Sequence, residues 1–277
     1  MPSGLVFACI APHGGYAIPE ACTPDEANLA PATQAGMLEL GRRCDAAGPE
    51  VLVVLTPHGI HVEGHFAVVI SGRMAGSLDD APVVALDVPV ARDLATSILA
   101  GLQEANIPAV GLSFGGNVPS DAVMPMDWGT LIPLWYLGGR REPPRSIVVV
   151  APARDRPLAE HVAAGVVVAA AANRSGLRVG LVASADQAHT YRADGPYGLS
   201  PRAAELDERI LAAVREGRLL SLLDLDPALV EEAKPDSWWQ LLMLAGATDD
   251  AWRPEVISFE VPTYFGMLCA AYSQPRP

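Results

Sequence analysis

Short apolar runs that alternate with longer segments of helical pattern are the feature that most constrains the fold of this chain. The runs are rich in Val, Ile and Leu, and each ends close to Pro, Gly or Ser. Their apolar residues do not alternate cleanly with polar ones, which is typical of strands buried on both faces of a sheet. The strands predicted in this way are residues 5–11, 51–56, 66–70, 109–112, 146–151, 179–183 and 256–259.

Helical patterns separate these runs. One helix is predicted to start after Thr23, because Thr23 has the place of an N-cap and Pro24 that of the first helical residue. Strands that alternate with helices predict an α/β fold with a mostly parallel central sheet, helices on both faces and the active site at the carboxyl edge. We expect one domain over residues 1–277. The other predicted helices are residues 89–104, 157–173, 201–215 and 236–246.

Charge and cysteine content exclude several classes of protein. The chain has 32 acidic and 19 basic residues, and no Lys/Arg cluster that would serve to bind nucleic acid or an anionic membrane surface. No apolar stretch is long enough to span a bilayer, and the apolar N-terminus lacks the basic start of a signal peptide. The four cysteines are far apart and form no C-x-x-C pair. We therefore expect a cytoplasmic protein with reduced thiols.

The tripeptide Pro-His-Gly occurs twice, each time at the end of a predicted strand. The first copy places His13 after residues 5–11, and the second places His58 after residues 51–56. Pro restricts the backbone where the strand ends, and Gly frees the turn that follows. Because His is the commonest metal ligand, two histidines in the same context at one sheet edge suggest a metal site.

A strand-end carboxylate would complete such a site. Glu260 follows the last predicted strand, so the same edge would carry two histidines and one carboxylate. This set binds Fe(II) in non-haem oxygenases and leaves positions open for substrate and oxygen, although zinc accepts the same ligands. From the residues alone, both metals stay open.

His189 is a candidate for proton transfer. It follows the strand at residues 179–183 in a loop, 184–200, that also contains Tyr191 and Asp194. A histidine beside such groups, at the same edge as a metal, suits a general acid or base. The remaining histidines are His61, expected in a polar turn, His65, expected at the start of a strand, and His161, expected in an Ala-rich helix.

Sequence signatures of other enzyme classes are absent. There is no G-x-S-x-G elbow, no P-loop, and no G-x-G-x-x-G after the first strand. Acyl transfer, phosphoryl transfer and dinucleotide binding therefore lose their usual support.

Five motifs in order resemble the class III extradiol ring-cleavage dioxygenases, the LigB-like family of the protocatechuate 4,5-dioxygenase type. The resemblance extends over nearly the whole chain. The motifs are APHGG (residues 11–15), TPHGIHVEGHF (56–66), MDWGTLIPLWYL (126–137), SADQAH (184–189) and SFEVPTYFGM (258–267).

This resemblance implies an Fe(II)-dependent enzyme that opens the ring of a catechol or 2-aminophenol with O2. It implies that His13, His58 and Glu260 are the iron ligands and that His189 is the acid/base residue. Trp128 stands where a substrate-facing His is frequent in the family, so we expect it to line the ring pocket at the end of the long loop 114–129. Members of the family commonly associate, so a homo-oligomer is expected.

Other readings of the same residues remain open. Arg154 is the candidate for binding a carboxylated substrate. The alternatives to the dioxygenase are a zinc hydrolase that uses the same three ligands and a non-catalytic metal-binding homologue. An inactive partner subunit is disfavoured, because such subunits tend to lack the ligands.

Overall fold

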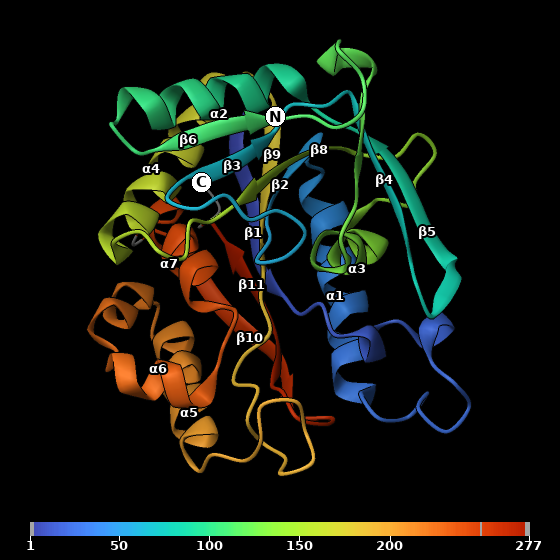
Figure 1. Ribbon diagram of the computed structural model, residues 1–277, viewed down its shortest axis with the longest axis vertical. Coiled ribbons are helices and arrows are strands. Elements are labelled where there is room, and N and C mark those ends of the chain that lie inside the picture. The colour runs from blue at the N-terminus through green and yellow to red at the C-terminus, as the bar shows by residue number, and fades with distance from the viewer. Residues whose placement is uncertain (1–2, 250, 275–277) are drawn as a thin grey trace.

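The central sheet of the protein has eight strands, in the order β10-β11-β1-β9-β2-β8-β3-β6 (Figure 1). The computed structural model describes residues 3–249 and 251–274. The strands are β1 (Gly4–Ala11), β2 (Val51–Leu55), β3 (Phe66–Val69), β6 (Ala109–Leu112), β8 (Ser146–Ala151), β9 (Arg178–Ser184), β10 (Arg253–Glu260) and β11 (Met267–Ser273).

The middle of this sheet is parallel. Strands β1, β9, β2 and β8 all run in one direction, and β10 shares it because β11 lies antiparallel between β10 and β1. Strands β3 and β6 run the other way. All five residues of β2 are buried, as expected for a continuous apolar strand covered on both faces. The predicted α/β class with a mostly parallel sheet is confirmed.

Helices cover both faces of the sheet (Figure 1). Helices α1 and α3 pack together on one face, and α4 contacts both α2 and α7 on the other. The helices are α1 (Pro31–Ala47), α2 (Arg92–Glu104), α3 (Trp128–Leu137), α4 (Leu158–Arg174), α5 (Arg202–Arg215), α6 (Pro227–Ala233) and α7 (Trp238–Ala247). No helix within the described ranges is long and apolar enough to cross a membrane.

The helix expected after Thr23 does not form there. Thr23 does hydrogen-bond to Glu26 as in a helix start, but the chain only turns, and α1 begins at Pro31. Pro31 explains this, because a proline disfavours helical geometry in the preceding residue. Ala30 has φ −128° and ψ 52°, and Pro31 then takes the first helical position.

A second, three-stranded sheet was not anticipated. Its order is β5-β4-β7, with β4 at Arg73–Leu78, β5 at Ala81–Pro89 and β7 at Val123–Pro125. Strand β5 is buried on one face only, so its residues do not form the continuous apolar run that marks the central strands. Strand β7 pairs with β4 and so ties down part of the loop expected at 114–129.

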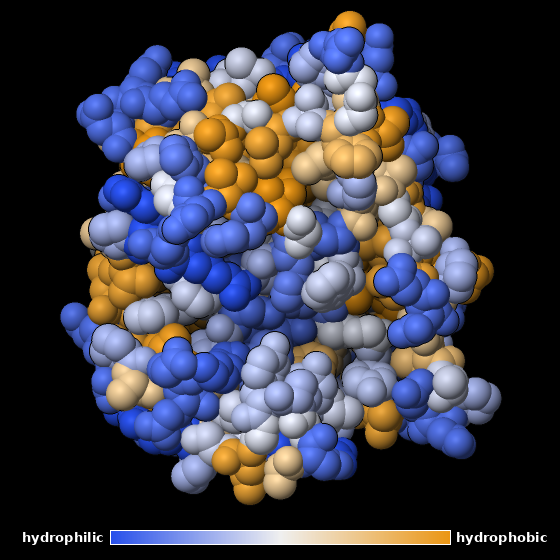
Figure 2. Space-filling view, viewed as in Figure 1, coloured by the Kyte–Doolittle hydropathy of each residue, from blue (hydrophilic) through white to orange (hydrophobic). Residues whose placement is uncertain are grey.

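Hydrophobic and hydrophilic side chains gather in different parts of the face seen in Figure 2. A hydrophobic area in the upper part lies over β6, whose residues are mostly only half-buried because it is an edge strand. Hydrophilic side chains cover the centre of the same face.

Candidate metal centre

His13 and His58 meet at the carboxyl edge of the sheet. Strand β9 lies between β1 and β2, and the two imidazoles converge over its end, with Nε2 to Nε2 at 3.1 Å. The glycine in each Pro-His-Gly is required by close packing: a Cβ on Gly59 would lie 2.7 Å from Asp127, and Gly59 also has φ 77°. The structure therefore brings the two predicted histidines together.

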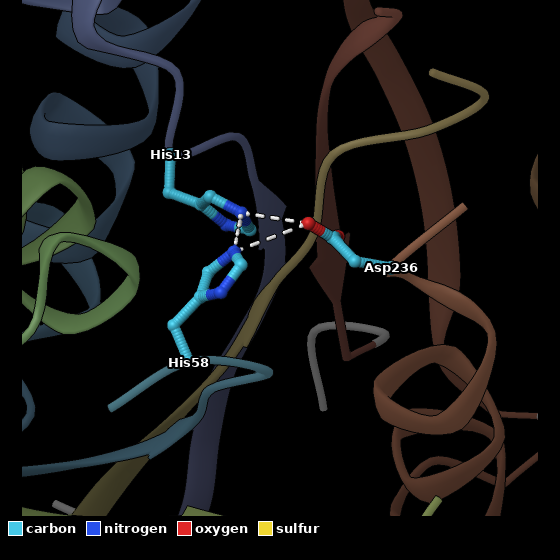
Figure 3. Close-up of side chains that lie close together, drawn as sticks. All are labelled: His13, His58 and Asp236. Carbon is cyan, nitrogen blue, oxygen red and sulfur yellow. Dashed lines mark hydrogen bonds and ion pairs between the residues drawn. The ribbon is translucent and has the colours of Figure 1, made fainter. Parts of the chain in front are cut away.

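Asp236 is the carboxylate that joins them, as Figure 3 shows. Its Oδ2 lies 3.0 Å from Nε2 of His13 and 3.3 Å from Nε2 of His58. Within residues 3–249 and 251–274, these three are the one group of His, Cys, Asp or Glu ligand atoms close enough to share a metal ion. Asp236 lies between α6 and α7, and not at the end of a strand.

The prediction that Glu260 is the third metal ligand is corrected, because Asp236 takes that place in the cluster. Glu260 does lie at the carboxyl edge, since β10 is parallel to β1, but β10 is two strand positions from β1 on the side away from β2. Neighbouring strands are about 4.8 Å apart, so Glu260 is separated from the strand of His58 by about four such spacings. Its carboxylate instead accepts a hydrogen bond from the backbone N–H of Thr33, in the first turn of α1.

No local signal in the sequence identifies Asp236. It precedes the apolar helix α7 with only Ser237 between, which is a common place for an aspartate near a helix start. The fold turns it toward the site: Gln240, one turn into α7, donates to the backbone carbonyls of Asp236 at 2.8 Å and Ser184 at 3.0 Å. The backbone N–H of Asp186 binds the other carboxylate oxygen of Asp236, at 3.0 Å, which leaves Oδ2 for the histidines.

Hydrogen bonds orient the imidazole of His13. Its Nδ1 lies 2.9 Å from Oγ of Ser184, and that hydroxyl donates its own proton to the carbonyl oxygen of Gly129. The hydroxyl therefore accepts from Nδ1–H of His13, which leaves Nε2 directed at Asp236. The backbone N–H of His13 is bound by Asp186 at 3.1 Å.

The charges of the cluster are strongly coupled. Burial disfavours the charged form of His13, but the carboxylates of Asp186 and Asp236 outweigh this and raise its pKa to about 9. Burial raises the pKa of Asp186 to about 6. Burial also opposes ionisation of Asp236, yet His13 and the hydrogen bonds from both histidines hold the pKa of this carboxyl below its usual range. A metal ion would therefore compete with a proton for Nε2 of His13.

The three ligand atoms fit a divalent transition metal. Metal–nitrogen and metal–oxygen bonds of about 2.0–2.2 Å place neighbouring ligand atoms about 2.9 to 3.4 Å apart at ordinary coordination angles. The three separations here, 3.0, 3.1 and 3.3 Å, lie within that range. Two imidazole nitrogens and one carboxylate suit iron or zinc and leave further coordination positions free.

His189 lies beside this cluster without being part of it. Its Nε2 is 3.8 Å from Oδ2 of Asp236, and its ring stacks on Phe265 with centroids 5.3 Å apart. The neighbours suggested by the sequence are not its partners: Tyr191 donates to Asp207 at 2.8 Å, and Asp194 pairs with Arg192. Asp207 was not anticipated.

Asp207 holds the segment on either side of His189. Its carboxylate accepts from the N–H of Ala188 at 2.9 Å and from the hydroxyl of Tyr191. Burial raises the pKa of Asp207 to about 7. The N–H of His189 itself donates to the carbonyl of Ala233, at the end of α6.

The metal-binding edge opens into a cavity of about 740 Å³, which we call the Trp128 cavity. Trp128 is half exposed there, and its ring lies 4.4 Å from the ring of His58. Trp128 thus lies on the wall of the cavity beside His58, and its contact with a substrate ring stays a prediction. The cavity is lined by His13, His58, Trp128, Asp236, His189 and Phe265, among others.

A second cavity of about 670 Å³, the Arg154 cavity, adjoins the same edge. Arg154 donates to the carbonyl of Pro57 at 3.0 Å and lies over the ring of Trp239, and it makes no ion pair within the described part of the chain. Burial lowers the pKa of Arg154. This cavity is lined by His58, His61, Arg154, His189, Asp236 and Trp239, among others.

His65 and His161 are not part of the group of ligand atoms at the metal centre. His65 is exposed and contacts the carbonyl of Glu63 at 2.9 Å through Nδ1. His161 is buried in α4 against Phe66, and burial lowers its pKa.

Comparison with known proteins agrees with this architecture. Residues 8–268 match the family model described as the catalytic LigB subunit of aromatic ring-opening dioxygenase. Protein CA_C1420 of Clostridium acetobutylicum is 22% identical over 255 residues, which are 91% of this chain and 54% of that protein, so the chain spans about half of its relative's length.

A solved structure with a similar fold is among the matches. It is the crystal structure of uncharacterized protein JW3007 from Escherichia coli K12, with a TM-score of 0.65 and 19% sequence identity. The match covers 96% of this chain and 99% of that chain.

Proposed function

Because this chain belongs to the family of the catalytic LigB subunit of aromatic ring-opening dioxygenases, we propose that it is a non-haem Fe(II)-dependent extradiol dioxygenase. Its substrates would be O2 and a small aromatic compound with adjacent hydroxyls, or a hydroxyl beside an amine. The observation that carries the proposal is the convergence of His13, His58 and Asp236 on one point at the floor of the Trp128 cavity.

The donor set would hold the iron by three bonds and leave adjacent positions for the two substrate oxygens and for O2. Bound there, Fe(II) would supply the electron transfer between the aromatic ring and oxygen. The protein contributes the orientation of the ring. Trp128 is half exposed and presents a large apolar surface on the cavity wall, and Phe265 lines the same cavity, so a flat ring can pack against the indole and exclude water.

His189 supplies the proton transfer in this proposal. Its Nε2 faces Oδ2 of Asp236 at 3.8 Å, so a substrate oxygen held at the metal centre would come within reach of the imidazole. Stacking on Phe265 and the backbone bond to Ala233 hold the ring in this position.

Arg154 would bind an anionic substituent of the substrate. Its guanidinium is partly buried beside His58 and His189 and has no carboxylate partner in the described chain. A buried cation without a counter-ion favours an anionic ligand. Arg154→Met should raise the KM for 3,4-dihydroxybenzoate by about tenfold and leave the KM for catechol nearly unchanged, since a charge-assisted hydrogen bond contributes about 1.5 kcal/mol or more.

The proposal is tested by loading the protein with Fe(II) without oxygen and then adding air with one compound of a small panel. Catechol, 3,4-dihydroxybenzoate, 4-methylcatechol and 2-aminophenol form the panel. Oxygen uptake and the yellow ring-opened product are followed together, with His58→Ala as the inactive variant and Glu260→Gln as the matched control. Equal amounts of oxygen consumed and product formed support the proposal.

Turnover that needs a metal but no oxygen would instead identify a hydrolase using zinc at the same ligands. Stoichiometric metal binding with no turnover of the panel or of ester and amide substrates would point to a non-catalytic homologue. Either result overturns the dioxygenase proposal.

A further inference from the structure

The first turn of α3, residues 127–130, lies against the ends of the two strands that converge on the metal centre. We propose that this turn positions both metal-binding histidines through two hydroxyl groups: Ser184 orients the imidazole of His13, and Thr56 holds the backbone of His58. The inference rests on the proposed metal site, and it assigns positioning roles to residues that touch neither metal nor substrate.

Ser184 fixes the orientation of the His13 imidazole. A serine hydroxyl has one proton, and here that proton goes to the carbonyl of Gly129, which belongs to the first turn of α3. The oxygen of Ser184 can then only accept from Nδ1–H of His13, at 2.9 Å. With Nδ1 protonated, the lone pair of a neutral His13 is on Nε2, the atom that faces Asp236 and His58.

Thr56 provides the second connection. Its hydroxyl donates to Oδ1 of Asp127 at 3.0 Å and accepts from the backbone N–H of His58 at 3.3 Å. Asp127 is the N-cap of α3, and it also binds the N–H and the hydroxyl of Thr130 at 3.0 and 2.9 Å. The cap that starts the helix therefore also holds the turn that carries His58.

Close contacts leave little freedom between the turn and the strand end. A Cβ on Gly129 would lie 2.7 Å from the hydroxyl of Thr56 and 3.2 Å from the ring of His58. Trp128, on the same turn, lies against that ring, with centroids 4.4 Å apart and ring planes tilted by 33°. One helix start thus places the carbonyl that fixes Ser184, the carboxylate that fixes Thr56 and the indole that contacts His58.

Removal of either hydroxyl should weaken metal binding without removing a ligand. Groups that orient a ligating histidine typically change metal affinity by about 10- to 100-fold when they are lost. Without Ser184, the imidazole of His13 loses the acceptor that holds its Nδ1–H, and the ring can rotate away from the position in which Nε2 faces Asp236 and His58.

The test uses the metal-free protein and Zn²⁺ as the probe, titrated in competition with a chelator. Ser184→Ala should lower the affinity by about 10- to 100-fold. Thr56→Val, which is nearly isosteric, should also lower it, whereas Thr56→Ser, which keeps the hydroxyl, should restore it. Ser71→Ala is the matched control, because Ser71 is a fully buried serine whose hydroxyl has no hydrogen-bond partner in the described chain.

Melting of the metal-free variants separates positioning from stability, since a residue that only supports the fold would lower the melting temperature and leave the Zn²⁺ affinity of the folded protein unchanged. Wild-type affinity in both Ser184→Ala and Thr56→Val overturns the inference. If Ser184→Ala fails to fold, Thr56→Val against Thr56→Ser decides it. Failure of the wild type to bind Zn²⁺, or binding that survives His13→Ala, would instead overturn the metal site itself.

Discussion

The segment around Asp236 and the end of strand β10 at Glu260 both bring a carboxylate to the same edge of the sheet, yet only one reaches the histidines. Asp236 lies in the connection between two helices, and Gln240 and Asp186 hold it in place through hydrogen bonds. Glu260 ends a strand in the orientation that the sequence suggested, but it binds the first turn of α1. Position along the sheet, and not the end of a strand as such, decides which carboxylate faces the site.

The lateral order of strands explains the difference. His13 and His58 come from strands on either side of β9, so their side chains meet over that strand. Strand β10 lies beyond β11 on the outer side of β1. The connection between α6 and α7, which carries Asp236, is not fixed by the order of the strands. It crosses the edge of the sheet near the end of β9, where Asp236 binds Asp186.

The largest expected effect separates the two carboxylates directly. Asp236→Ala should lower Zn²⁺ or Fe(II) affinity by more than about 100-fold, because loss of a direct ligand costs more than loss of an orienting partner. Glu260→Gln should keep wild-type affinity. Metal content after dialysis and titration of the metal-free proteins measure both, and the opposite pattern would restore Glu260 as the ligand.

His189 lies next to Asp236, and its replacement tests whether it transfers a proton or binds the metal. If it transfers a proton without binding the metal, His189→Ala should keep the metal and lose about 10²- to 10⁴-fold in kcat. Iron content and steady-state turnover on the best substrate of the panel are the measurements. Loss of iron in this variant would make His189 a ligand, and unchanged turnover would remove its role.

The pH dependence of metal binding should also distinguish the cluster of His13, His58 and Asp236 from the end of strand β10 at Glu260. The pKa of His13 is raised to about 9, so below that pH a proton occupies the site that the metal needs. Binding should therefore release about one proton at pH 7, and affinity should rise about tenfold per pH unit from pH 6 to 8. Calorimetry in buffers of different ionisation enthalpy counts the protons. Glu260→Gln should leave the count unchanged, and a count of zero would contradict the protonated state of His13.

Trp128 should affect the substrate more than the metal. Trp128→His replaces the large apolar indole beside His58 with a smaller ring that exchanges protons, so we expect a change of about tenfold in KM that differs among substrates. Iron content should stay at the wild-type level. Identical kinetics across the panel would show that the wall of the pocket lies elsewhere.

The smallest effect is expected for the stability role of Glu260. Ala30, the N-cap residue of α1, makes no side-chain cap, and Glu260 binds the N–H of Thr33 from across the structure. Glu260→Ala should therefore cost about 1 kcal/mol in the free energy of unfolding, as for the loss of a helix cap. Urea denaturation of the metal-free protein measures it, with Glu104→Ala as control, because Glu104 is exposed and its side chain makes no hydrogen bond or ion pair in the described chain. A cost no larger than that of the control would show that the contact is not stabilising.

Much of the fold could be predicted from the sequence because it depends on local patterns. Continuous apolar runs such as 51–55 identify strands buried on both faces, and Pro-His-Gly identifies where two of them end. Strand β5 was missed because it is buried on one face only, and the start of α1 was placed too early because Thr23 and Glu26 form their capping contact within a single turn.

The sequence by itself determined the α/β class, the two histidines and the candidate residues His189 and Trp128, since each follows from periodicity, from a turn motif or from family resemblance. The tertiary structure alone decided which carboxylate joins the histidines. Asp236 is 223 residues from His13 in the chain, and their 3.0 Å contact depends on the lateral order of the strands and on the packing of α7. No local pattern encodes that order, because it results from how all the strands and helices bury their apolar surfaces together.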